Sequence, residues 1–209
     1  MTNKFGNIDN DIPNQYKGDR LFKGDVDWWN NAVIDLWSLE KGLYATGYKV
    51  SGDLLVDHVI RNQDSPRHAL VFPVIFLYRQ YLEIRMKDII IAGSELIGTS
   101  GDFPGNHRLD ELWRKCRPLL EGRVDSTDLD MSEKYIQEFS DKDPTSQAFR
   151  YPNDRKGNLS LPENIIDNVI NLRRFREVMG KIAAILDGAS DDIYQLLQEK
   201  RSNETQNPC

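Results

Sequence analysis

The stretch ALVFPVIFLYRQYLEIRMKDIIIAGSEL, residues 69–96, determines the fold of this chain. Its apolar side chains fall on nearly every face of a helix, which is typical of a helix at the centre of a protein. Charged residues interrupt it at Arg79, Glu83, Arg85, Lys87 and Asp88, and a lipid-spanning helix would not tolerate them. The sequence therefore predicts a long central helix in an all-α protein, and no membrane partner.

Further helices are predicted on both sides of the central one, because apolar residues recur there at spacings of three and four. Gly47 is expected to end the first of them and Ser51 to cap the second, while Ser190 is expected to cap the last. Prolines and glycines mark residues 143–163 as an ordered loop, with a small hairpin around residues 154–157. The expected helices cover residues 25–48, 51–62, 107–120, 131–139, 165–186 and 191–200.

Length and composition describe one globular domain. The 209 residues are 39% hydrophobic and 29% charged, which suits a packed core. We expect an extended N-terminal arm over residues 1–24, a helical domain over residues 25–201 and a mobile tail over residues 202–209. The net charge of −6 excludes a surface built throughout to attract phosphate, so only local basic patches are candidate nucleic-acid contacts.

Two cysteines, Cys116 and Cys209, form neither a disulfide framework nor a zinc or CxxC spacing, which indicates a reducing compartment. The polar N-terminus has no signal-peptide pattern, so the expected location is the cytoplasm. The sequence lacks a phosphate-binding glycine loop, a GxSxG elbow, an HExxH motif and a dinucleotide fingerprint. With three histidines in the chain, we expect no metal site and no cofactor.

The charged pair Arg79 and Glu83 is the most informative local feature. The two residues lie one helical turn apart on an otherwise apolar stripe of the central helix, where they can pair. Burying such charges costs several kcal/mol per ion unless they are paired and hydrogen-bonded. Two interpretations follow: a structural ion pair that orients helices, or a polar cleft that binds a ligand. Arg85 and Lys87 turn away from this stripe and are expected to be solvated.

Two other segments contain candidate site residues. His107 follows a Gly-Pro-Gly loop and either caps the next helix or, beside a carboxylate, acts as an acid or base. Arg150 lies between Phe149 and Tyr151 in a proline-flanked loop, where it either pins the loop or presents a guanidinium to phosphate. Basic clusters at residues 114–117 and 173–176 add candidate phosphate contacts, or are solvated helix faces.

Together, the central helix with Arg79 and Glu83, the His107-x-Leu109-x-x-Leu112-Trp113 segment, the loop at residues 149–152 and the closing helix resemble small prokaryotic helical proteins of the HEPN superfamily. The resemblance spans roughly residues 69–197. It implies a HEPN-like helical bundle and, for many members, a metal-independent ribonuclease that acts as a dimer in toxin–antitoxin or phage-defence systems. Other members are inactive and serve as binding modules.

The resemblance also implies candidate catalytic residues. The superfamily motif is an Arg, a polar residue and, a few residues later, a His, which Arg61, Asn62 and His68 match. Pro66 lies inside this gap, and the motif of active members normally occupies a late helix, whereas this pair precedes the central one. The first hypothesis is therefore RNA binding or cleavage, with His68 or His107 as acid or base and Arg61, Arg79 or Arg150 holding phosphate.

The second hypothesis is a non-catalytic interaction module that binds a protein or a nucleotide through a polar cleft around Arg79. The partners that the two hypotheses name are RNA, a second copy of the chain, and an antitoxin or other protein. The two are distinguished by whether these side chains converge in an open groove or are buried and dispersed.

Overall fold

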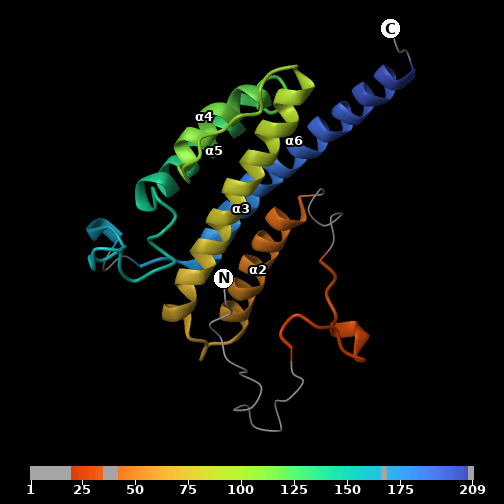
Figure 1. The fold of residues 1–209 in the computed structure, drawn as a ribbon. Helices are drawn as coiled ribbons and strands as arrows, with labels where there is room; N and C mark the ends of the chain where they lie inside the picture. Colours follow the sequence, from red (N-terminus) through yellow and green to blue (C-terminus); the bar gives the residue numbers. More distant parts are fainter. Residues whose placement is uncertain (1–19, 35–41, 166–168, 207–209) are drawn as a thin grey trace, which may run out of the picture. The chain divides into compact units, whose positions relative to one another are not determined.

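The computed structural model describes residues 20–34, 42–165 and 169–206. The chain divides into two compact units, Met1–Leu36 and Trp37–Cys209. The described part of the first unit contains one 3-10 turn, η3 (Trp28–Asn30). The second unit contains α2 (Leu43–Arg61), α3 (Arg67–Leu96), α4 (Leu109–Leu120), α5 (Ser126–Lys142), the 3-10 turn η4 (Glu163–Ile165) and α6 (Leu172–Gln206), drawn in Figure 1. The described ranges contain no strand, which confirms the prediction of an all-α fold.

The apolar stretch forms the central helix of the second unit, as predicted. Helices α2, α4 and α6 pack against α3, and α5 packs against α4 (Figure 1). Leu82 and Met86 in the middle of α3 have no exposed surface. Truncating either side chain to alanine would cost about 2–5 kcal/mol, so α3 is the main source of core packing. No helix in the described ranges is long and apolar enough to cross a membrane.

The helix predicted over residues 25–48 is wrong in its first part. Only η3 forms there, and residues 31–34 adopt no regular structure, while residues 35–41 lie outside the described residues. The Asn31 amide oxygen accepts from the Asp25 backbone N–H at 2.9 Å, and its amide nitrogen donates to the Asp25 carbonyl at 2.7 Å. Such side-chain bonds satisfy the backbone without a helix, which periodicity alone does not detect.

The predicted break between two helices at Gly47 and Ser51 is also wrong, because α2 runs through both residues. Its start is set at Gly42, whose φ of +64° is a left-handed conformation that suits glycine. Gly52 lies against the Tyr78 ring, and an added Cβ there would be 3.1 Å from that ring. This close approach fixes how α2 packs against α3.

The C-terminal helices predicted over residues 165–186 and 191–200 are one helix, α6, which begins at Leu172. The Asn171 side chain accepts from the Arg174 backbone N–H at 3.0 Å and satisfies the first turn. Ser190 is buried inside α6 and caps nothing. Residues 202–206, expected as a mobile tail, continue the helix, and residues 207–209 lie outside the described ones.

The loop after α5 has the predicted small hairpin. Asn153 and Leu159 form an antiparallel bridge, and Gly157, with a φ of +86°, donates to the Asp154 carbonyl at 3.1 Å. Phe149 is buried, so the loop packs onto the body of the second unit, as expected from its aromatic residues. Helix α5 is longer than predicted, since the Asp125 side chain caps it by accepting from the Thr127 backbone N–H at 2.8 Å.

Candidate active site

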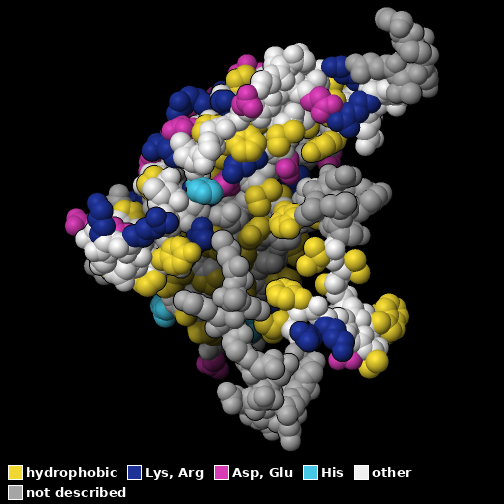
Figure 2. All heavy atoms as spheres, in the orientation of Figure 1, with side chains coloured by type: hydrophobic (Ala, Val, Ile, Leu, Met, Phe, Trp, Pro, Cys, Tyr) yellow, Lys and Arg dark blue, Asp and Glu magenta, His cyan; other side chains and the backbone are white. Residues whose placement is uncertain are grey.

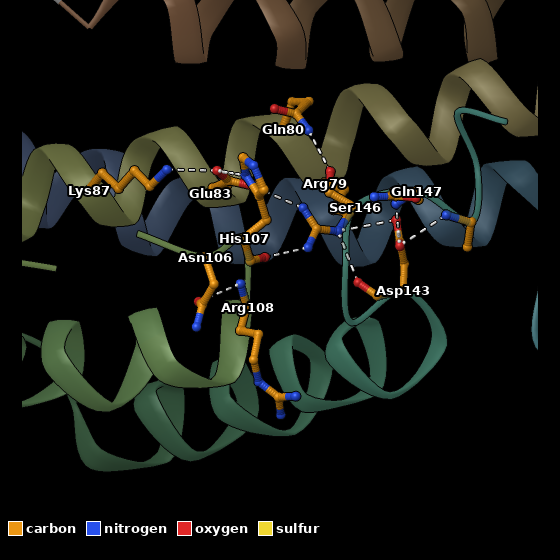
Figure 3. A network of polar contacts seen from close by, with 11 residues as sticks. Arg79, Gln80, Glu83, Lys87, Asn106, His107, Arg108, Asp143, Ser146 and Gln147 are labelled. Atoms are coloured by element: carbon orange, nitrogen blue, oxygen red, sulfur yellow. Dashed lines mark hydrogen bonds and ion pairs between the residues drawn. The ribbon is translucent and has the colours of Figure 1, made fainter. Parts of the chain in front are cut away.

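The candidate site is built on one face of α3. Arg79, Glu83 and Lys87 follow one another at intervals of four residues, so their side chains lie along the same side of the helix. The prediction that Lys87 turns away from this stripe into solvent is therefore wrong, because its Nζ lies 2.7 Å from Glu83 Oε1 and its side chain is 23% exposed. This side meets the end of the loop that precedes α4 and the chain that follows α5 (Figure 3). Two segments that are far apart in the sequence therefore converge on α3.

Arg79 connects these segments from a position with no exposed surface. Its Nη1 lies 3.0 Å from Glu83 Oε2, its Nη2 donates to the His107 carbonyl at 2.6 Å, and its Nε lies 3.2 Å from Asp143 Oδ2 (Figure 3). The ion pair predicted between Arg79 and Glu83 is confirmed, and it is buried. Because a soluble ligand cannot reach the guanidinium, we assign Arg79 a structural role.

Asp143 is the second anion of this network, and the sequence reasoning missed it. It is 1% exposed, and its Oδ1 accepts from the backbone N–H groups of Gln147 and Ala148 at 2.9 and 3.1 Å. Ser146 lies in the turn between Asp143 and Gln147, with a φ of +62°, and its hydroxyl accepts a hydrogen bond from the Gln80 side chain at 2.9 Å. An aspartate directly before a proline at a helix end was the available signal, because such a side chain commonly closes a turn.

Glu83 is an ionised carboxylate under an exposed histidine. Its Oε1 lies 2.7 Å from Lys87 Nζ and 2.8 Å from His107 Nδ1 (Figure 3). Burial alone would raise the pKa of Glu83, but the hydrogen bonds and positive charges of Lys87 and His107 outweigh it and hold the pKa below the ordinary 4.5. The buried carboxylate therefore carries its charge at neutral pH, as its Arg79 contact also requires.

His107 is held at both ends and remains accessible. Its carbonyl accepts from Arg79, its Nδ1 faces Glu83, and its side chain is 55% exposed. An ionised carboxylate only accepts, so Nδ1 carries the proton and Nε2 is the nitrogen left with a lone pair in the neutral ring. The prediction that His107 caps a helix is wrong, since α4 begins at Leu109 and Asn106 Oδ1 accepts from the Arg108 N–H at 3.2 Å.

The motif pair Arg61 and His68 lies elsewhere, at the turn between α2 and α3. Arg61 is the last residue of α2, His68 is in the first turn of α3, and both are exposed. Among the described residues, neither has a hydrogen bond or an ion pair with the other or with the Arg79 network. The hypothesis that these two residues form a catalytic pair stays a prediction.

Arg150 stacks between aromatic rings on the surface. Its guanidinium carbon lies 5.4 Å from the centre of the Phe76 ring and 5.2 Å from that of Tyr151, and its Nη2 lies 3.2 Å from the Tyr151 hydroxyl. These contacts favour the interpretation that Arg150 pins the loop, with the buried Phe149 beside it.

Neighbouring acids neutralise the basic cluster at residues 114–117 in part, whereas in the cluster at residues 173–176 only Arg176 has an ion-pair partner among the described residues. Arg117 pairs with Asp130 at 2.6 Å and with Glu133, and Figure 2 shows basic and acidic side chains side by side over α4 and α5. Arg176 pairs with Asp57 of α2. Arg85, predicted to be solvated, is 7% exposed and pairs with Asp187 of α6 at 2.8 Å, because α6 covers that side of α3.

In the described ranges, no three His, Cys, Asp or Glu side chains are grouped as a metal site would need. The chain matches no protein-family model, no curated protein and no solved structure at a significant level. The class that fold and site define is therefore an all-helical protein with a buried Arg-Glu-Asp network beneath an exposed histidine.

Proposed function

We propose that the chain is a HEPN-like, metal-independent endoribonuclease in which His107 is the general acid–base group and Glu83 its positioning residue. One observation carries the proposal: His107 Nδ1 lies 2.8 Å from a buried, ionised carboxylate while the imidazole is 55% exposed. A carboxylate that fixes the tautomer and orientation of a histidine, with the second nitrogen free, is the arrangement that acid–base catalysis requires.

The chemistry needs no metal. His107 Nε2 takes the proton of a ribose 2′-hydroxyl, the 2′-oxygen attacks phosphorus, and the P–O5′ bond breaks. The imidazolium then returns its proton to the leaving 5′-oxygen, which gives a 2′,3′-cyclic phosphate and a 5′-hydroxyl. Glu83 stabilises the imidazolium formed between the two proton transfers.

The phosphate would be met by Lys87 in this proposal. Its ammonium and the His107 ring contact the same oxygen of Glu83, and its side chain is 23% exposed. Lys87 thus takes the phosphate-binding role that the sequence analysis gave to Arg79, because the Arg79 guanidinium has no exposed surface.

The experiment incubates purified protein with mixed cellular RNA in EDTA and compares the wild type with His107→Gln. Glutamine can still donate a hydrogen bond to Glu83 but cannot exchange protons, so we expect cleavage to fall at least about 100-fold while the fold is kept. His58→Gln is the matched control, since His58 is an exposed histidine on α2. The product ends should be 2′,3′-cyclic phosphates.

Three results decide between the hypotheses. Intact RNA with the wild type refutes the nuclease proposal. Cleavage that survives His107→Gln but is lost in His68→Gln moves the centre to the turn between α2 and α3. Saturable, salt-sensitive RNA binding without cleavage refutes the catalytic role of His107 and leaves RNA binding, the non-catalytic form of the same hypothesis.

A further inference from the structure

A second candidate site lies away from His107, between the end of α5 and the beginning of α6. It is a cavity of about 560 Å³, a size in the range of small-molecule sites. The residues of its floor come from α3, α5, α6 and the loop after α5, and they are core residues with at most 8% exposure: Ile75, Phe139, Phe149, Met179 and Ile182. The cavity therefore reaches the apolar core instead of resting on it.

The rim of this cavity is charged. Lys142 from the last turn of α5 and Arg174 from the first turn of α6 line it, with one acid, Glu138. Neither cation has an ion-pair partner among the residues that the structure describes. By contrast, Arg108, Arg117 and Arg176 each pair with an acid, so the rim of the cavity presents two cations whose charge a ligand could neutralise.

The geometry points to a binding site for a small carboxylate with an apolar tail. The tail would displace water from the aromatic and aliphatic floor, which is favourable by the hydrophobic effect. The carboxylate would remain at the rim between Lys142 and Arg174, where the N-terminal end of α6 adds its positive dipole. A neutral apolar ligand would leave both cations unpaired, and a phosphate without a tail would leave the floor wet, so neither matches both halves of the site.

The tail can be an acyl chain or an aromatic ring, because a cavity of about 560 Å³ accommodates either and its wall includes the rings of Phe139 and Phe175. The experiment is isothermal titration of the full chain with decanoate, with 2-naphthoate and with the neutral analogue decanol, all below their micelle concentrations. Saturable binding of either carboxylate supports the site, and the tighter of the two identifies the tail. We expect decanol to bind at least about tenfold more weakly than decanoate, since a hydrogen bond to a charged group is lost.

The variants separate this site from nonspecific adhesion. Lys142→Ala with Arg174→Ala should weaken carboxylate binding at least about tenfold and leave decanol binding unchanged. Arg173→Ala is the matched control, because Arg173 is exposed in the same helical turn and does not line the cavity. Val178→Phe, which fills the cavity from its half-buried wall, should abolish binding while thermal unfolding stays cooperative.

Absence of saturable binding by both carboxylates overturns the inference, and so does equal affinity of the wild type and the double variant. The inference is independent of the proposed nuclease activity. His107→Gln should bind both carboxylates like the wild type, so a failure of one proposal is distinguishable from a failure of the other.

Discussion

Replacing Arg79 by methionine tests the network that organises the second unit. Methionine keeps most of the apolar stem and removes only the guanidinium, so little cavity is created. The substitution therefore isolates what the charged group contributes: its contacts with Glu83, with Asp143 and with the His107 carbonyl.

The expected magnitude follows from the groups left behind. Glu83 keeps its bonds to Lys87 and His107, and Asp143 keeps two backbone N–H donors on Oδ1. The carbonyls of His107 and Asp143 lose the hydrogen bonds that Arg79 donates, and Asp143 Oδ2 loses its ion pair with the guanidinium. Removing one member of a buried ion pair typically costs about 3–5 kcal/mol. Since a domain is stable by about 5–15 kcal/mol, the variant should fold but be markedly weakened.

The assay is equilibrium unfolding in urea, followed by circular dichroism at 222 nm. With an m-value of about 2 kcal/mol/M, the midpoint should fall by about 2 M. Arg108→Met is the matched control, because Arg108 pairs with Asp110 and Glu111 at the surface with its side chain 45% exposed. Its midpoint should shift far less, since exposed pairs contribute little.

The result that would refute this reasoning is a shift no larger than that of Arg108→Met. It would mean that the guanidinium is not needed to hold the loop of His107 and the turn of Asp143 on α3. Arg79→Lys adds a second criterion: a single ammonium cannot reproduce the three directions of the fork, so it should restore only a minor part of the loss.

Two further predictions concern single positions. Glu83→Gln should destabilise the protein by about 3 kcal/mol at pH 7. Because the folded-state pKa of Glu83 is lowered below 4.5, the stability that its charge contributes is present above pH 4.5 and is lost as the pH falls through the folded-state pKa. The thermal unfolding temperatures of the wild type and the variant should therefore converge in acid. Divergence in acid would contradict it. Gly42→Ala should lower the stability by about 1–2 kcal/mol, since φ is +64° and a Cβ would lie 2.8 Å from Arg85 Nη1. Gly47→Ala should instead stabilise α2, because a Cβ there meets nothing within 4 Å. Calorimetry that shows a change of the same sign for both variants would refute this prediction.

The sequence predicted the central helix well because α3 is apolar on nearly every face, which is typical of a helix surrounded by other elements. The predicted helix boundaries were wrong where a capping signal in a single turn was taken as the end or the start of a helix. Ser51 and Ser190 are good capping residues, yet both lie inside helices, because core contacts continue past them. The opposite error occurred near Asn31, where local side-chain bonds compete with a helix that the apolar spacing favours.

The candidate site was predictable only along α3. A spacing of four residues places Arg79 near Glu83 whatever the rest of the fold does, so that ion pair followed from the sequence. The partners that complete it are 28 and 64 residues away in the chain, at His107 and Asp143. Periodicity says nothing about such contacts, because they depend on how α4 and α5 return to α3.

The network also explains why one histidine is both fixed and exposed. Helix α3 holds the His107 backbone through Arg79 and its ring through Glu83, two residues one turn apart on a rigid element. A histidine that only anchored a loop would need one of these contacts, and a solvated one would need neither. Holding both ends costs the burial of two charges and leaves the ring 55% exposed, which is the preorganisation that the proposed proton transfer would require.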